Sequence, residues 1–243
     1  MKKAAIIIAV VVVVGAICAA LVLRGWPGVL TGSGNLETKE YAFTNFTRVE
    51  VSSAFEFEIK QSSSYSINVT ADDNVIDRVQ VSQDGQTLKI TVGGAPTIFR
   101  SVTLKASVTM PELGGLAVSG ACSGTVSNFN STEAVSITVS GASRVTGDIT
   151  AGDIEFDISG ASTIQLEGSA DDMIAAVSGA STCNLGDFTV NDADVNVSGA
   201  STGTINLNGR LDANVSGAST LLYIGDPIMG TIDVSGASTL REK

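Results

Sequence analysis

Apolar and polar residues alternate with a period of two along most of the chain. In the segment Ile154 to Ile158, three apolar residues are separated by Glu155 and Asp157. This alternation predicts a β-strand with one face in a core and the other in solvent. The corresponding inward positions are Ile137 and Val139, Val195 and Val197, Ala213 and Val215, and Ile232 and Val234. A second short strand is predicted downstream, for example at Ile164 and Leu166 or at Ile205 and Leu207.

The tripeptide Ser-Gly-Ala divides these strands into regular units. It begins at Ser119, Ser140, Ser159, Ser178, Ser198, Ser216 and Ser235, and five copies continue as Ser-Gly-Ala-Ser-Thr. The intervals of 18 to 21 residues are too short for helical-hairpin repeats, and glycine with β-branched residues disfavours helix. We therefore predict an all-β fold, a parallel β-helix with coils of about 19 residues whose strands stack ~4.8 Å apart.

The motif itself has a structural interpretation. Its glycine suits a corner whose backbone conformation a β-carbon would oppose, and we expect the alanine to turn inward and the serines to hydrogen-bond along the rod. Cys122 belongs to the first copy and Cys183 to the fourth, so stacking separates them by ~14 Å. A disulfide needs α-carbons within ~7 Å, and both thiols are therefore predicted to be free and mostly buried.

The N-terminal part keeps the strand pattern without the motif. We assign residues 35–243 to one β-helix domain, with longer, irregular coils over 35–117 and the Ser-Gly-Ala repeats over 118–240. Asp84-Gly85 is a predicted turn within the irregular part. At the other end, Arg241, Glu242 and Lys243 place charge where an open sheet edge would invite association.

The first 24 residues differ from the rest. Lys2 and Lys3 precede the uncharged segment 4–23, whose twenty residues match the ~30 Å hydrocarbon thickness of a bilayer as a helix. Two lysines before the segment and Arg24 after it predict a single-pass membrane anchor with the C-terminal domain outside the cytoplasm. A cleaved signal peptide, or lipidation at Cys18, is the alternative. Residues 25–34, with Pro27 and four glycines, form a predicted linker.

Charge narrows the possible partners. All 25 acidic residues but only 11 of the 14 basic residues lie beyond Arg24, so that part carries a net charge of −14. This disfavours nucleic acid and anionic lipid as ligands. An acidic surface that keeps a rod soluble explains the charge without any ligand.

The residues that most enzymes use are missing. The chain has no histidine, which excludes a Ser-His-Asp triad and histidine-ligated metals, and no cysteines at zinc spacing. We predict no cofactor, no metal and no enzymatic activity. A polysaccharide-active enzyme using carboxylates alone is the alternative, with Asp171 and Asp172, or Asp192 and Asp194, as the candidate pairs. Both pairs lie at irregular corners, where solvated loops are the expected explanation. Asn-x-Ser/Thr triplets begin at Asn45, Asn68, Asn130, Asn196 and Asn214.

Several short motifs resemble one known family. They are Gly32-Ser33-Gly34-Asn35, the strand pattern from Phe46 to Ile59, Ala71-Asp72-Asp73-Asn74-Val75, Leu88-Lys89-Ile90 and the run Val108 to Leu113. Together with the glycine-rich repeats they resemble the family named putative auto-transporter adhesin, head GIN domain, over nearly all of Gly32 to Leu240. The resemblance implies an exported bacterial or archaeal protein with a right-handed parallel β-helix. It implies no catalytic or binding residues.

These observations favour a cell-surface adhesion or ligand-binding module that engages a glycan or an envelope protein. The candidate binding residues form an outward ladder, Asp157, Asn196, Asn214 and Asp233. An envelope scaffold or sensor that binds a membrane partner is the alternative. A further alternative is an ice- or mineral-ordering hydroxyl grid, which requires the Ser and Thr after each Ser-Gly-Ala to face outward. Its serines are Ser162, Ser181, Ser201, Ser219 and Ser238, each with the threonine that follows.

Overall fold

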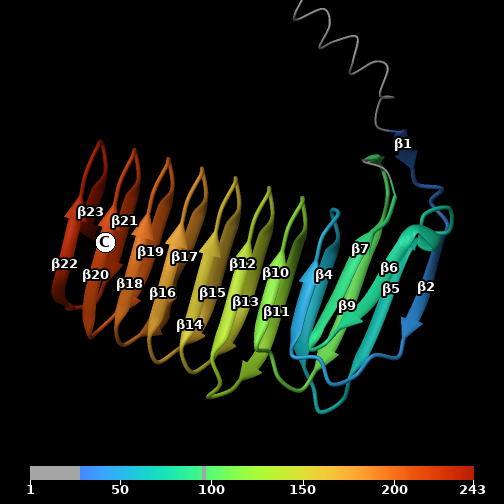
Figure 1. Ribbon diagram of the computed structural model, residues 1–243, viewed down its shortest axis with the longest axis horizontal. Coiled ribbons are helices and arrows are strands. Elements are labelled where there is room, and N and C mark those ends of the chain that lie inside the picture. The colour runs from blue at the N-terminus through green and yellow to red at the C-terminus, as the bar shows by residue number, and fades with distance from the viewer. Residues whose placement is uncertain (1–27, 95–96) are drawn as a thin grey trace, which may run out of the picture.

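Two β-sheets face each other along the length of the molecule and enclose the core between them. The computed structural model describes residues 28–94 and 97–243. One sheet has ten strands and the other eleven, and the chain passes from one to the other at each turn of the solenoid (Figure 1). Within the described residues, no helix is long and apolar enough to cross a membrane. The predicted anchor at residues 4–23 lies outside the described part of the chain.

The repeat region forms seven strand pairs, one strand of each pair in each sheet. The ten-stranded sheet receives β10 (Gly115–Val118), β12 (Val135–Val139), β14 (Ile154–Ile158), β16 (Met173–Val177), β18 (Ala193–Val197), β20 (Arg210–Val215) and β22 (Ile228–Val234). The eleven-stranded sheet receives β11 (Ser123–Asn130), β13 (Arg144–Thr150), β15 (Thr163–Ser169), β17 (Thr182–Val190), β19 (Thr202–Leu207), β21 (Thr220–Ile224) and β23 (Thr239–Glu242). Neighbouring strands are parallel, which confirms the predicted all-β solenoid.

Strand register places the apolar residues in columns that run along the core. In the ten-stranded sheet, Ile158 lies beside Val139 and Val177, and all three are buried. Phe156 packs edge-on against Phe188 of the opposite sheet, with ring centroids 6.2 Å apart. The alternation read from the sequence therefore identified the buried residues of the internal strands correctly, whereas Ile232 and Val234, also predicted to point inward, are exposed in β22.

The Ser-Gly-Ala corner differs from the prediction in one respect. Each glycine has a left-handed backbone, with φ of +78° at both Gly160 and Gly179, as expected for a corner that a β-carbon would oppose. The alanine after it is exposed, and the next residue, such as Ser181, is buried instead. The predicted inward alanine is thus wrong, because the chain turns one residue later and Ser181 begins the inward alternation.

The buried residues of these corners form a ladder that runs along the rod. Its members are Cys122, Ser143, Ser162, Ser181, Ser201, Ser219 and the partly exposed Ser238. The Ser181 hydroxyl donates to the Gly160 carbonyl and accepts the Ser162 N–H, both at 3.4 Å. The serines therefore do connect successive coils, through backbone groups rather than through one another.

The N-terminal part closes the other end of the core with mixed strand directions. It comprises β1 (Gly28–Thr31), β2 (Leu36–Tyr41), β3 (Arg48–Val51), β4 (Glu56–Gln61), β5 (Ser66–Asp72), η1 (Ile76–Arg78), β6 (Val79–Asp84), β7 (Thr87–Val92), β8 (Thr97–Arg100) and β9 (Leu104–Met110). Strands β3 and β4 form a coil that pairs with β10 and β11. Strand β5 is antiparallel to both of its neighbours, β2 and β9. Strands β6 and β7 are also antiparallel and are joined at the predicted Asp84-Gly85 turn.

These antiparallel pairs were not expected, because alternation shows which side chains point inward but not the direction of the neighbouring strand. The segment predicted as a linker, residues 25–34, contains strand β1, which pairs with β8.

Both described cysteines are free and buried, as predicted. Burial raises the pKa of the Cys183 thiol to about 12 and also raises that of Cys122. A raised thiol pKa in the folded state stabilises the fold below the unfolded value, near 9, and that contribution disappears as pH rises towards 12.

With Cys18 replaced by alanine, we expect no rapid labelling of the native protein by a thiol reagent at pH 8 and two labelled thiols in urea. Rapid labelling of the native protein would contradict this burial.

Candidate ligand-binding face

The predicted ladder lies in one row on the outer surface of the ten-stranded sheet. Register aligns Asp157, Asn196, Asn214 and Asp233 across β14, β18, β20 and β22, with Ala176 of β16 between the first two. All four predicted side chains are exposed. The structure thus brings them together as a row, while their role as ligand-binding residues remains a prediction.

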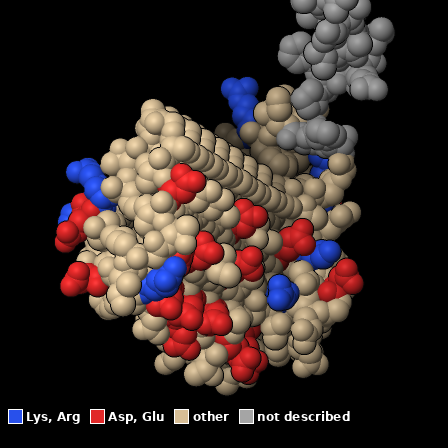
Figure 2. Space-filling view, turned by 60° about the vertical axis from the view of Figure 1, so that its left-hand side comes forward, with Lys and Arg blue, Asp and Glu red and all other residues tan. Residues whose placement is uncertain are grey.

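Two further rows run parallel to this ladder and are strongly acidic. One contains Glu155, Ile174, Asp194 and Asp212, and the other, at the start of the same strands, contains Asp153, Asp172, Asp192 and Arg210. We call these two rows and the ladder the acidic face. Figure 2 shows acidic side chains gathered together with few basic ones among them, beside an uncharged ridge of stacked coils. Coils spaced ~4.8 Å apart hold these carboxylates at close, regular intervals.

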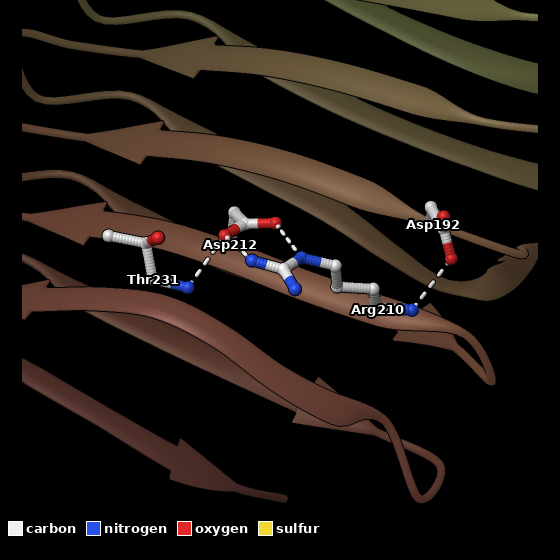
Figure 3. Close-up of polar contacts among 4 residues, drawn as sticks. All are labelled: Asp192, Arg210, Asp212 and Thr231. Atoms are coloured by element: carbon white, nitrogen blue, oxygen red, sulfur yellow. Dashed lines mark hydrogen bonds and ion pairs between the residues drawn. The ribbon is translucent and has the colours of Figure 1, made fainter.

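Part of this charge is used to connect coils. Arg210 forms an ion pair with Asp212 at 2.6 Å, and its backbone N–H donates to Asp192 at 2.7 Å (Figure 3). Asp212 also accepts the Thr231 N–H from β22. The Arg210 guanidinium and this N–H hold the pKa of Asp212 well below its usual range. In the C-terminal part of the acidic face, Arg210 therefore neutralises some of the negative charge.

A groove of about 510 Å³ opens at the other part of the acidic face. Its charged and hydroxyl side chains are Arg48, Ser136, Asp153, Glu155 and Asp172, and Gly114, Ala134 and Ile174 contribute small or apolar surface. We call it the Arg48 groove. A β-carbon on Gly115 would lie 3.2 Å from Nη1 of Arg48, so the arginine extends over this glycine. Because Gly115 has no side chain, the sheet surface is lowered there.

The Arg48 groove combines available charge with an apolar surface. Within the described residues, neither Arg48 nor Asp153, Glu155 or Asp172 takes part in an ion pair. Ile174 is 61% exposed, a large apolar side chain among carboxylates. The groove therefore offers one strong donor, several acceptors and an apolar contact to a single ligand.

A second groove, of about 500 Å³, lies on the eleven-stranded sheet. Glu56, Glu58, Asn68, Lys105 and Ser107 are among its polar residues. Lys105 forms an ion pair with Glu56 at 3.2 Å, and Lys60 with Glu58 at 2.6 Å. Since its charges already neutralise one another, this groove is the weaker candidate for recognition of a polar ligand.

The carboxylate pairs considered for catalysis join the acidic face only in part. Asp172, Asp192 and Asp194 belong to it, while Asp171 lies beside it at the same exposed turn as Asp172. Among residues 28–94 and 97–243, no three acidic or cysteine side chains gather closely enough to hold a metal ion.

The hydroxyl grid is not formed, because Ser162, Ser181, Ser201 and Ser219 point into the core. One outward column of threonines remains, Thr163, Thr182, Thr202, Thr220 and Thr239. A single column does not provide the two-dimensional spacing that the grid hypothesis requires.

Two residues of the Arg48 groove, Arg48 and Ile174, were not among the binding residues predicted from the sequence. Arg48 precedes the repeats by about 70 residues, and its approach to Ser136 depends on the pairing of β3 with β10. Ile174 occupies an outward strand position, where an apolar residue among charged neighbours was the available signal.

The comparisons with known proteins show the family through a family model and the fold through solved structures. A family model described as putative auto-transporter adhesin, head GIN domain, matches residues 45–227. A putative adhesin from Bacteroides fragilis is similar in structure, with a TM-score of 0.83 and 21% identity over 88% of this chain and 100% of that one. A putative adhesin from Parabacteroides merdae has a TM-score of 0.68 and 18% identity, covering 89% of this chain and 99% of its own.

A third similar structure carries a different description. It is a putative lipid binding protein from Parabacteroides distasonis, with a TM-score of 0.65 and 21% identity over 88% of this chain and 99% of that one. At these identities the likeness concerns the fold alone. No curated protein matches the chain.

Proposed function

Because the chain belongs to the family of putative auto-transporter adhesins with a head GIN domain, we propose that it is a surface adhesion module that binds a glycan through the acidic face. The apolar segment 4–23 would anchor it in the cell membrane, with the solenoid outside the cytoplasm. Family membership and the adhesin-like neighbours support a binding role rather than a catalytic one.

The composition of the Arg48 groove is the observation that carries this proposal. A sugar ring has hydroxyls at its edge and an apolar C–H surface. Glu155 and Asp153 would accept hydrogen bonds from hydroxyls, Arg48 would donate to ring or hydroxyl oxygens, and Ile174 would contact the C–H surface. The polar ladder beyond the groove would extend the contact along a polymer, so that weak contacts add by multivalency.

The charge of the acidic face predicts which glycans bind. With eight carboxylates and one arginine, the face should favour neutral or amino-bearing glycans and repel uronate-rich or sialylated ones. We expect binding of the full chain in mild detergent to a panel of envelope and host glycans to follow this order. Preferential binding to anionic polysaccharides would contradict the proposal.

A double substitution tests the groove itself. Asp153→Asn with Glu155→Gln removes two charges from exposed side chains that form no hydrogen bonds within the described residues, so the fold should be retained. Replacing charge-assisted hydrogen bonds with neutral ones should weaken glycan affinity about tenfold or more, as measured by calorimetry. Asp187→Asn with Glu167→Gln, the same pair of changes at aligned exposed positions of the eleven-stranded sheet, is the matched control and should leave affinity unchanged. Equal effects of both variants would exclude the Arg48 groove.

The neighbour described as a lipid binding protein suggests a second candidate function. Including lipid vesicles in the same binding panel tests this function. The negative charge of the acidic face predicts that the solenoid has no affinity for anionic bilayers. Residues 4–23 would themselves insert into vesicles, so vesicle binding favours the lipid function only if substitutions on the solenoid weaken it and no glycan binds. The absence of both glycan binding and such solenoid-dependent vesicle binding would favour a scaffold or sensor acting through residues 4–23.

A further inference from the structure

Two large apolar side chains lie exposed on the small two-stranded sheet of β1 and β8. Register places Val29 beside Ile98, and their side chains belong to residues that are 61% and 53% exposed. The next residues along the strands, Leu30 and Phe99, point the other way and pack against the core. We call the outward surface that holds Val29 and Ile98 the β1–β8 patch. Outward positions of the repeat strands are mostly polar, so this apolar pair departs from the pattern of the molecule.

Hydrogen bonds hold the β1–β8 patch on the body of the domain. The Gly32 N–H donates to the Arg100 carbonyl at 3.2 Å, which continues the pairing of the two strands. The side-chain amide of Asn74 donates to the Thr31 carbonyl at 2.9 Å. The patch is therefore part of the folded domain, and the domain determines its orientation.

The length of the chain keeps this patch close to the apolar segment 4–23. Strand β1 is the first described element, and Val29 comes six residues after Leu23, where the apolar segment ends (Figure 1). Six fully extended residues span at most ~20 Å, and the headgroup region on each side of a bilayer is ~5–7 Å thick. If segment 4–23 spans a bilayer, Val29 lies within ~15 Å of the headgroups. At this distance the tether makes even a weak apolar contact effective.

The charge around the patch also differs from that of the whole chain. Residues 28–36 and 97–103 contain no acidic residue, although acidic residues outnumber basic ones in the sequence. Arg100 follows Ile98 by two positions, is exposed and forms no ion pair within the described residues. An arginine can keep its guanidinium at the level of the headgroups while neighbouring apolar side chains lie deeper. The patch therefore has the composition of a membrane-interface contact.

We propose that the β1–β8 patch docks onto the bilayer in which residues 4–23 are anchored, with Val29 and Ile98 among the headgroups and Arg100 at the lipid phosphates. This inference rests on the anchor of the proposed function and goes beyond it, because it assigns a membrane contact to the folded domain. The acidic face takes no part, since β1 and β8 belong to neither of the two large sheets. Because the tether supplies the local concentration, the contact requires no affinity of the separate solenoid for lipid. Docking fixes how the domain is oriented on its short linker.

A nitroxide spin label on Thr31→Cys reports on the surroundings of the patch and leaves its apolar pair intact. Thr31 is exposed, faces outward like Val29 two positions before it, and aligns with Arg100. The label is introduced in the full chain with Cys18→Ala, reconstituted in phosphatidylcholine vesicles. Thr182→Cys, at an exposed threonine of the repeat region, is the matched control. We expect the ratio of collision rates with lipid-soluble oxygen and with a water-soluble nickel chelate to be about threefold or more higher at Thr31 than at Thr182.

Removing the apolar pair should abolish this difference. Val29→Thr with Ile98→Thr keeps β-branched side chains at two exposed strand positions, so the fold and the Tm in detergent should be retained. The collision ratio at Thr31 should then fall to that at Thr182. Ile174→Thr is the control, because it removes a similarly exposed isoleucine from the acidic face, and it should leave the ratio at Thr31 unchanged.

Trp26, the only tryptophan of the chain, separates failure of the docking from failure of the anchor. It comes three residues after segment 4–23, so brominated lipids should quench its fluorescence when that segment is inserted. A quenched Trp26 with equal collision ratios at Thr31 and Thr182 would overturn the docking and leave the anchor in place, whereas an unquenched Trp26 would overturn both.

Two further results would also contradict the proposal. Dipolar broadening between labels on Thr31, with both collision rates reduced, would show that a second copy of the chain covers the patch instead of lipid. A high collision ratio at Thr31 that survives the replacement of Val29 and Ile98 would exclude these side chains as the membrane contact.

Discussion

Replacing Gly179 with alanine should lower the free energy of unfolding by about 3 kcal/mol. A non-glycine residue in the left-handed region costs roughly 1–2 kcal/mol, and overpacking adds roughly 1–3 kcal/mol. Both effects apply, because Gly179 has φ +78° and a β-carbon there would be in severe contact with the Gly160 carbonyl oxygen of the preceding coil. The neighbouring coil cannot move away, since the Ala180 N–H donates to that same carbonyl at 2.8 Å.

Urea unfolding of the full chain in mild detergent measures this effect, and Gly186→Ala is its control. Gly186 also lies in the repeat region, but its nearest contacts for an added β-carbon are at 3.5 Å or more and its φ is not positive. We expect the Gly186 variant to unfold at the wild-type midpoint. If both glycines tolerate alanine equally, successive corners do not stack as closely as described.

Asp72→Ala should destabilise the N-terminal end and lower Tm by about 5 °C or more. The side chain is buried at the end of β5, where Oδ1 accepts the Gly34 N–H and Oδ2 accepts the Thr103 N–H, both at 2.7 Å. Alanine would leave the N–H groups of Gly34 and Thr103, which belong to two different segments, without these partners. Asp73→Ala is the matched control, because Asp73 is exposed and accepts one hydrogen bond, from the Ser33 hydroxyl.

The effect of Asp72 should depend on pH. The Thr103 and Gly34 N–H groups lower the pKa of this carboxyl below its usual value. A lowered pKa in the folded state contributes stability above the unfolded value, near 4, and that contribution is lost as pH falls further. The Tm difference between wild type and Asp72→Asn should therefore be constant above pH 5 and shrink as pH falls below 4. A constant difference down to pH 2.5 would contradict this role.

The contacts around Asp72 explain the structural role of two motifs that the sequence analysis used only for the family resemblance. Gly32-Ser33-Gly34-Asn35 and Ala71-Asp72-Asp73-Asn74 lie side by side, and Asn74 accepts the Ser33 N–H and donates to the Thr31 carbonyl. A β-carbon on Gly32 would clash with Asp72. The motifs therefore build the closed end of the solenoid rather than a binding site.

Features that a local pattern determines could be predicted from the sequence. Alternation at Ile154 to Ile158 predicted inward and outward residues, and the spacing of Ser-Gly-Ala predicted parallel stacking, because every coil meets a copy of itself. The same stacking placed Asp157, Asn196, Asn214 and Asp233 in one row. Within a corner the pattern was insufficient, since the exposed Ala180 and the buried Ser181 are both small and fit either side.

The Arg48 groove could not be predicted, because it is assembled from segments distant in the chain. Strand β3 lies between β10 and β7, although β4 to β9 separate it from β10 in the chain, so spatial order departs from chain order in this part. Arg48 thereby comes to lie among Ser136, Glu155 and Ile174. Sequence spacing contains no information about such an insertion.

Carboxyl footprinting tests the glycan-binding face most directly. The full chain is labelled with a carbodiimide and an amine, with and without the glycan that binds best, and modification of each carboxylate is measured by mass spectrometry. Binding at the Arg48 groove predicts protection of Asp153, Glu155 and Asp172, with no change at Asp148, Glu167 and Asp187 on the eleven-stranded sheet. Protection of the second set, or of neither set at saturating glycan, would contradict it.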